Sequence, residues 1–117
     1  MQFDHYTVLL LLRPVDAPEL SEEETDALQD AHLSHQAGLA EKGYVIAAGP
    51  LVDQDDERLR GIAVLSVDAD TARKLYSTDP SVRAGRLETQ VMTWLTPAGN
   101  VAFESVRHPR SMAEAVG

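Results

Sequence analysis

Residues 21–43 read SEEETDALQDAHLSHQAGLAEKG, and the organisation of the whole chain follows from this segment. Its first residues form a capping box, because the Ser21 hydroxyl can accept the backbone N–H of Glu24 while the Glu24 side chain reaches back. The acidic first turn suits the helix dipole, and Gly43 is well placed to end a helix. The sequence therefore predicts a helix over residues 22–42.

One stripe of this predicted helix combines apolar residues with two histidines. Its members recur at intervals of three and four and so share one face: Leu28, Ala31, His32, His35 and Leu39. We expect both histidines to point toward the core. An inward imidazole beside a carboxylate can transfer protons near neutral pH, although a lone inward histidine is more often a hydrogen-bonded core residue.

Four segments rich in strand-forming residues surround the helix, at residues 3–12, 44–48, 62–67 and 87–95. The run Val8–Leu12 is apolar on both faces, which indicates a central strand. Asp68 or Asp70 can cap a short second helix, and Asp79-Pro80 ends it before one further turn at residues 81–85. The order β-α-β-β-α-β predicts an α+β fold, ferredoxin-like with an antiparallel sheet.

The length of the chain predicts one domain, residues 1–97, followed by a C-terminal extension, residues 98–117, with little pattern of its own. Two helices can cover only one face of the sheet, so the other face needs a partner. Met92 and Trp94 share the second face of the last strand. We therefore expect a homodimer, as in dimeric α+β barrels, with the extension as a tail or as an arm over the partner subunit.

Composition excludes several classes of site and partner. The chain has no cysteine, which excludes disulfides, thiolate nucleophiles and cysteine-based metal sites. A formal net charge of −9 without a basic stripe argues against nucleic acid. Neither GxGxxG nor GxxxxGK occurs, so no nucleotide cofactor is expected. We expect a cytoplasmic protein without a membrane partner, because the apolar runs are short and no secretory signal pattern is present.

Several short motifs follow one another along the chain: His32, Gly43, Ala48-Gly49-Pro50, Gly61, Asp79-Pro80-Ser81-Val82 with Ala84-Gly85, and a closing strand with Trp94. In order and spacing they resemble the YCII-related domain family over roughly residues 3–96. The resemblance implies a ferredoxin-like dimeric α+β barrel with a proposed His-Asp dyad in a cleft. The dyad falls on His32 and Asp79. The long acidic segment before the helix and the C-terminal extension depart from the family pattern.

Family members with known activity include a dehydrochlorinase acting on a chlorinated hydroxyquinol. The hypothesis is a small cofactor-independent enzyme, of lyase or isomerase type, that uses general acid–base catalysis on a small organic substrate. Asp79 would hold one nitrogen of His32 and fix its tautomer, leaving the other nitrogen to move a proton. An Asp before a proline also commonly starts a turn, so Asp79 has a structural role to fill as well.

Other residues are candidates for binding the substrate. Gly49 and Pro50 are expected to shape the cleft, and Arg83, or Arg86, can pair with an anionic substrate. His35 is a further pocket candidate. It also forms a His-x-x-His pair with His32 that could bind a metal, although without a third motif we expect none.

For the two remaining histidines, the sequence gives weaker indications of a role. His5 is read as half-buried structure or a pocket residue, and His108 as part of the tail. The alternative function is a noncatalytic small-molecule-binding or accessory dimeric module. A cofactor-free monooxygenase on the same barrel is a third, less favoured option.

Overall fold

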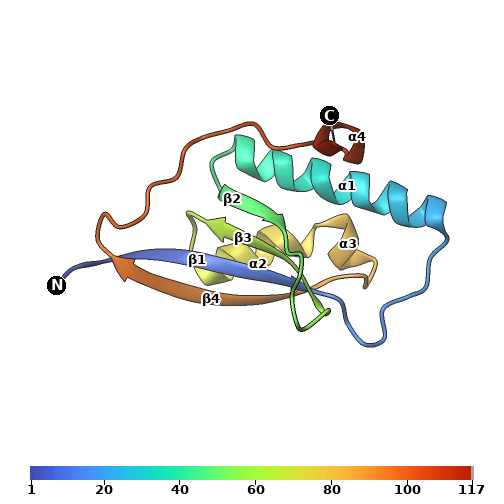
Figure 1. The fold of residues 1–117 in the computed structure, drawn as a ribbon, viewed down its shortest axis with the longest axis horizontal. Helices are drawn as coiled ribbons and strands as arrows, with labels where there is room; N and C mark the ends of the chain where they lie inside the picture. Colours follow the sequence, from blue (N-terminus) through green and yellow to red (C-terminus); the bar gives the residue numbers. More distant parts are fainter. Residues whose placement is uncertain (117) are drawn as a thin grey trace.

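A four-stranded antiparallel sheet in the order β2-β3-β1-β4 organises the protein (Figure 1). The structure is a computed structural model that describes residues 1–116. The strands are β1 (Phe3–Leu12), β2 (Val45–Pro50), β3 (Leu59–Leu65) and β4 (Glu88–Pro97). β1 pairs with β3 on one side and β4 on the other, as its two-sided apolar pattern predicts.

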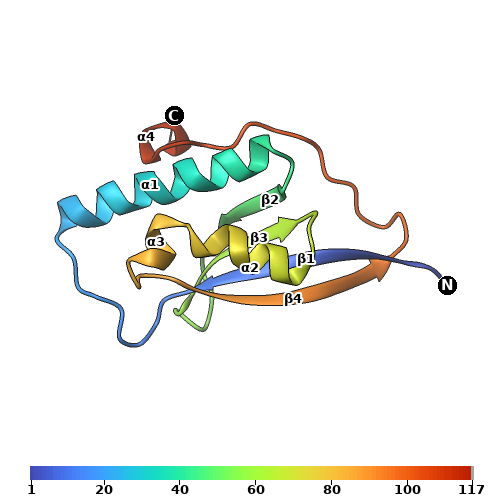
Figure 2. The ribbon, with the colours of Figure 1, turned by 180° about the vertical axis from the view of Figure 1, so that it is seen from behind.

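The helices α1 (Glu22–Glu41), α2 (Ala69–Ser77) and α3 (Pro80–Arg83) all lie on one face of this sheet (Figures 1 and 2). The element order and the antiparallel pairing confirm the predicted ferredoxin-like α+β fold. A short helix, α4 (Met112–Val116), follows β4 and packs against α1. No helix within residues 1–116 has the length and hydrophobicity needed to cross a bilayer.

Local sequence determines where the two longer helices begin. The Ser21 hydroxyl accepts the N–H of Glu24 at 3.1 Å, and the Glu24 carboxylate accepts the N–H of Ser21 at 3.2 Å, which completes the predicted capping box. Asp68 caps α2 by accepting the N–H of Thr71 at 2.7 Å. After α1 the chain turns at Gly43, whose φ of 81° suits a residue without a side chain.

Three strands extend beyond the predicted apolar runs at one end, because backbone pairing does not need apolar side chains. β2 continues from the predicted Ala48 to Pro50. β3 begins at Leu59, three residues before the predicted Ile62, and the Arg60 carbonyl accepts the N–H of Leu51 at 3.0 Å. β4 continues to Pro97, which lies opposite Phe3 of β1. Hydrophobic patterning therefore locates these strands but places these ends two or three residues short, and it extends β3 to Val67, two residues past its observed end at Leu65.

The core lies between the helices and the sheet. Its largest fully buried apolar side chains are Tyr76, Leu9 and Leu65, which come from α2, β1 and β3. The opposite face of β4 carries Met92 and Trp94, each 40% exposed. The second face of the sheet is thus more open than the helix-covered face.

Candidate active site

A buried hydrogen-bonded pair joins α1 to the start of α3. His32 Nδ1 lies 2.6 Å from Asp79 Oδ2, across 47 residues of sequence. Asp79 is 0% exposed and His32 is 6% exposed. A carboxylate oxygen accepts hydrogen bonds, so Nδ1 of His32 carries the hydrogen in this contact and donates the hydrogen bond to Asp79 Oδ2. The other ring nitrogen, Nε2, is then the basic one.

The second oxygen of Asp79 has a separate task. Oδ1 accepts the backbone N–H of Ser81 at 2.8 Å and that of Val82 at 3.4 Å, so Asp79 is the N-cap of α3. Pro80 fills the first helical position, where a missing N–H costs nothing. Asp79 therefore orients His32 with one oxygen and holds the local fold with the other.

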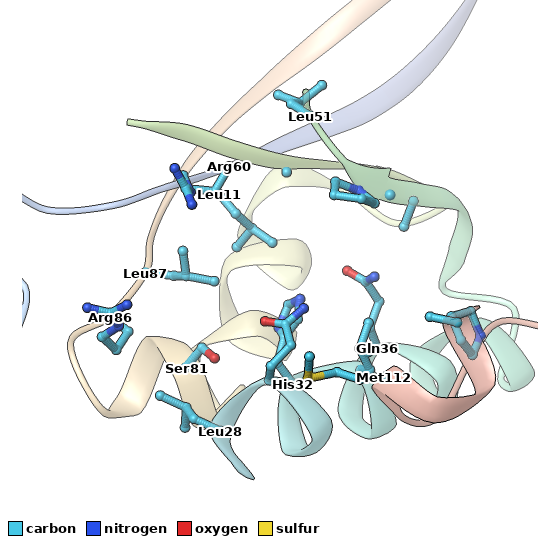
Figure 3. A pocket seen from close by; sticks show the side chains of 18 of the residues that line it. Leu11, Leu28, His32, Gln36, Leu51, Arg60, Ser81, Arg86, Leu87 and Met112 are labelled. Carbon is cyan, nitrogen blue, oxygen red and sulfur yellow. The ribbon is translucent and has the colours of Figure 1, made fainter. Parts of the chain in front are cut away.

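His32 faces a cavity of about 850 Å³ between α1, the sheet and the C-terminal segment (Figure 3). The His32 ring rises from α1 into this space. The cavity is lined by residues from every one of these elements, among them Leu11, Leu28, His32, Gln36, Gly49, Pro50, Ser81, Leu87, His108 and Met112. Asp79 lies behind His32 and does not line the cavity, so a solute can reach the imidazole and not its carboxylate partner.

The candidates named from sequence separate into two groups. Gly49 and Pro50 line the cavity on the sheet side. Arg83 does not line it, because it is an exposed residue of α3, whereas Arg86, reached after a turn at Gly85, does line it. His5 is exposed on β1 and lies outside the cavity lining.

His35 lies beside the pair and does not reach the cavity. Its Nε2 lies 3.0 Å from the Thr78 hydroxyl oxygen, and this hydroxyl donates its own hydrogen to the Leu75 carbonyl at 2.9 Å. Thr78 therefore accepts from His35 Nε2, and Nδ1 is the other ring nitrogen of His35. That Nδ1 is buried without a hydrogen bond, 3.4 Å from Asp79 Oδ2. His32 thus has the only side-chain hydrogen bond to Oδ2 within residues 1–116.

The sequence pattern did not predict a second buried hydrogen-bonded pair, Tyr76 and Gln36. Tyr76 donates its hydroxyl hydrogen to Gln36 Oε1 at 2.8 Å, and both side chains are buried. Burial, and then the negative charge of Asp79, raises the pKa of Tyr76 well above its ordinary value. Gln36 lies four residues after His32 on the same helix face, so helical periodicity could have identified it.

The C-terminal segment forms part of the cavity wall, and the expectation that His108 belongs to a free tail is not met. His108 and Met112 both line the cavity. The segment is held on α1 of its own chain: the N–H of Met112 donates to Asp30 Oδ1 at 2.8 Å, and Arg110 forms an ion pair with Glu41. These contacts are polar and join residues far apart in sequence, so hydrophobic periodicity does not reveal them.

No cluster of three or more His, Cys, Asp or Glu side chains arranged to hold a metal ion occurs in the part of the chain that the structure describes. Of the His-x-x-His pair, His32 forms its hydrogen bond with Asp79 through Nδ1.

Comparisons with known proteins show the family and the fold of the chain. The model of the YCII-related domain matches residues 8–95. A similar solved structure is the 5-chloro-2-hydroxyhydroquinone dehydrochlorinase (TftG) from Burkholderia phenoliruptrix AC1100, in complex with 2,5-dihydroxybenzoquinone. The TM-score is 0.55 at 18% sequence identity, over 76% of this chain and 92% of that chain, which shows a shared fold. No curated protein sequence matches the chain.

Proposed function

The chain belongs to the YCII-related domain family, and on this premise we propose that it is a cofactor-independent enzyme of lyase or isomerase type. His32 is its general acid–base and Asp79 its positioning partner. The observation that carries the proposal is the 2.6 Å contact between Asp79 and the inner nitrogen of His32, which leaves the outer nitrogen directed at a cavity. A histidine serving only the core would not need a cavity at its free nitrogen.

The reaction needs only a proton acceptor and a leaving group. His32 Nε2 takes a proton from a carbon or hydroxyl of the substrate, and the freed electron pair forms a double bond. In an elimination a halide leaves with its bonding pair; in an isomerisation the proton is returned at another atom. Neither outcome changes the overall oxidation state, so no redox cofactor is required. The name of the similar structure, a dehydrochlorinase, supports the elimination.

Asp79 stabilises the cationic form of His32 that the proposed reaction requires. When Nε2 gains a proton, His32 becomes a cation beside a carboxylate that is fully buried and held by two backbone N–H groups. A charge pair in a dry environment interacts more strongly than in water. Gly49 and Pro50 shape the opposite wall, and among the arginines that follow Asp79 it is Arg86, not Arg83, that can meet a substrate in the cavity.

We further propose that the protein is a homodimer through the face of the sheet that the helices leave open. Met92 and Trp94 lie on that face and are each 40% exposed. A second copy packed on this face would remove the free-energy cost of exposing these apolar side chains to water. Buried between two sheets, these side chains would no longer contact water.

Substitution of His32 tests the enzymatic proposal. A panel of chlorinated hydroquinones and hydroxyquinols is incubated with wild type, His32→Gln and His5→Gln, and chloride release is measured. His32→Gln is expected to lose about 10²- to 10⁴-fold in rate. His5→Gln is the control, because His5 is exposed and does not line the cavity. Turnover that persists in His32→Gln contradicts the role of His32, and binding of the panel without turnover by wild type favours a noncatalytic binding module.

A further inference from the structure

Three arginines from three separate segments line the same cavity. Arg13 follows β1, Arg60 belongs to β3, and Arg86 follows α3. In Figure 3, Arg60 and Arg86 lie on one side of the cavity and Gln36 on the other, with His32 between them. The fold therefore gathers positive charge at one side of the space that His32 faces.

None of these three arginines has a carboxylate partner within residues 1–116. Their hydrogen bonds go to backbone carbonyls instead: Arg13 Nε to Arg86 at 3.1 Å, Arg60 Nη1 to Glu57 at 3.1 Å and Arg86 Nη1 to Pro18 at 2.9 Å. These bonds use one N–H of each guanidinium group and leave others free.

Four other arginines of the chain form ion pairs with carboxylates, and only exposed Arg83 shares the lack of one within residues 1–116. Arg58 and Arg73 form ion pairs with Asp56 and Asp70, each at 2.8 Å. The chain has a formal net charge of −9, so acidic groups are in excess. Arginines that stay unpaired on a cavity wall, in a chain with this excess of acidic groups, indicate that an anionic ligand is their counter-ion.

The three groups also act on one another. Burial, followed by the positive charges of Arg86 and Arg60, lowers the pKa of Arg13. The two carboxylates that line the cavity, Asp26 and Asp53, form no ion pair with these arginines in the described part of the chain. A bound anion would remove the repulsion among the arginines.

We infer that Arg13, Arg60 and Arg86 form a subsite for the carboxylate of a small organic acid, whose carbon skeleton extends toward His32 Nε2. The inference deepens the proposed function and rests on it, since it assumes that the cavity holds the substrate. Guanidinium groups match a carboxylate with paired N–H donors. Leu11, Leu28 and Leu87 line the same cavity and suit an apolar skeleton better than free phosphate.

The subsite would assist the proton transfer. A carboxylate held by arginines has its negative charge partly neutralised, so a neighbouring C–H loses its proton more readily to a base. His32 Nε2 is that base in the proposed reaction. Binding and chemistry would then be divided between the arginine side of the cavity and the histidine at its centre.

Benzoate and benzamide test the subsite, because they share a shape and differ in charge. Their dissociation constants are measured by titration followed by NMR in wild type, Arg60→Gln, Arg86→Gln and Arg13→Gln. We expect wild type to bind benzoate about tenfold more tightly than benzamide, and each substitution to reduce this preference about five- to tenfold. Arg73→Gln is the control, since Arg73 lies on α2 away from the cavity, and it should keep the preference.

Inorganic phosphate is added as a competitor. Failure of phosphate to displace benzoate at equal concentration supports a carboxylate subsite; phosphate binding to these arginines in place of benzoate overturns it. Thermal unfolding identifies any variant that fails to fold. If Arg13→Gln or Arg86→Gln fails to fold, the affinities of Arg60→Gln test the subsite, because Arg60 is exposed and its substitution should leave the fold intact. Equal affinity for benzoate and benzamide in wild type also overturns the inference.

A second variant separates this inference from the proposed function. His32→Gln should keep the preference for benzoate while chloride release is lost. If wild type lacks the preference but His32-dependent turnover is present, the subsite is wrong and the enzymatic proposal stands. The panel for this comparison also contains chlorinated hydroxybenzoates, which carry the carboxylate that the subsite requires. If the preference for benzoate is present and no compound of this extended panel is turned over, the subsite stands and the enzymatic proposal fails.

Discussion

Asp79 Oδ1 accepts the backbone N–H of Ser81 at 2.8 Å, so the carboxylate that holds the His32 imidazole is also the N-cap of a helix. The side chain cannot rotate to release His32 without uncapping α3. A buried carboxylate with both oxygens engaged is fixed in position before any substrate arrives. This relationship separates two effects of substitution at residue 79, one on the fold and one on the ring.

Asp79→Asn should keep the cap and reverse the hydrogen bond to His32. An asparagine oxygen can still accept from Ser81, but the amide then presents a donor to Nδ1, which forces the proton of His32 onto Nε2. We expect a folded protein whose rate falls about 10²- to 10⁴-fold. ¹⁵N NMR of the imidazole reports the tautomer, and thermal unfolding reports the cap. Asp68→Asn makes the same change at the cap of α2, and a similar loss of activity there would contradict this explanation.

Tyr76→Phe should remove a pH dependence of stability. Burial and then Asp79 raise the pKa of Tyr76, so the folded protein keeps this phenol neutral where the unfolded chain ionises, near pH 10. The unfolded state then binds fewer protons, and stability falls as the pH rises above about 10. Urea unfolding at about pH 8 and about pH 10.5 measures the loss in wild type, which Tyr76→Phe should reduce.

The same substitution leaves Gln36 Oε1 without its donor. We expect Tyr76→Phe to lower the free energy of unfolding by about 1–2 kcal/mol near neutral pH. Tyr44→Phe is the control, because Tyr44 is an exposed residue, and it should change neither quantity much. An unchanged alkaline loss in Tyr76→Phe would mean that other groups cause it.

Asp30→Ala should loosen α4 without unfolding the domain. The substitution removes the acceptor of the Met112 N–H, one of the few bonds that hold the C-terminal segment on α1. Hydrogen–deuterium exchange of residues 108–116 should become several-fold faster, with a change in global stability of about 0.5 kcal/mol or less. Asp30→Asn keeps an acceptor and should exchange like wild type. Equal exchange in all three proteins would show that this bond does not anchor the segment.

Trp94→Lys should convert the expected homodimer to a monomer. It places a charge on the open face of the sheet, where an interface between two copies would have to bury it. Sedimentation velocity compares wild type, Trp94→Lys and Thr93→Lys, since Thr93 belongs to the same strand and points to the other face. A wild-type protein that sediments as a monomer at micromolar concentration refutes the homodimer.

The sequence predicts those parts of the fold that depend on local pattern. Ser21 and Glu24 locate the start of α1, and the two-sided apolar run in β1 identifies an interior strand. Helical periodicity predicts that His32 points inward, but it does not predict which residue His32 contacts. Only the resemblance to the YCII-related domain family indicates Asp79, because nothing in the 47 residues of sequence separation between the two side chains predicts their contact.

The sequence predicts less of the cavity wall. Arg13 and Arg60 follow or belong to strands in which they look like ordinary solvated residues, and only the packing of β1 against β3 brings them together. Arg83 and Arg86 are equally good candidates in the sequence. The turn at Gly85 decides between them, since it carries the chain from Arg83, which is exposed on α3, back to the cavity at Arg86.

His108 and α4 complete the cavity although they lie beyond residues 8–95, the span that the YCII-related domain model matches. The proposed acid–base pair and this part of the cavity wall therefore lie on separate stretches of polypeptide. A different C-terminal segment would change that wall while the sheet and α1 stay the same, so residues 108–116 are a compact region for protein engineers to randomise when the cavity is to accept other compounds.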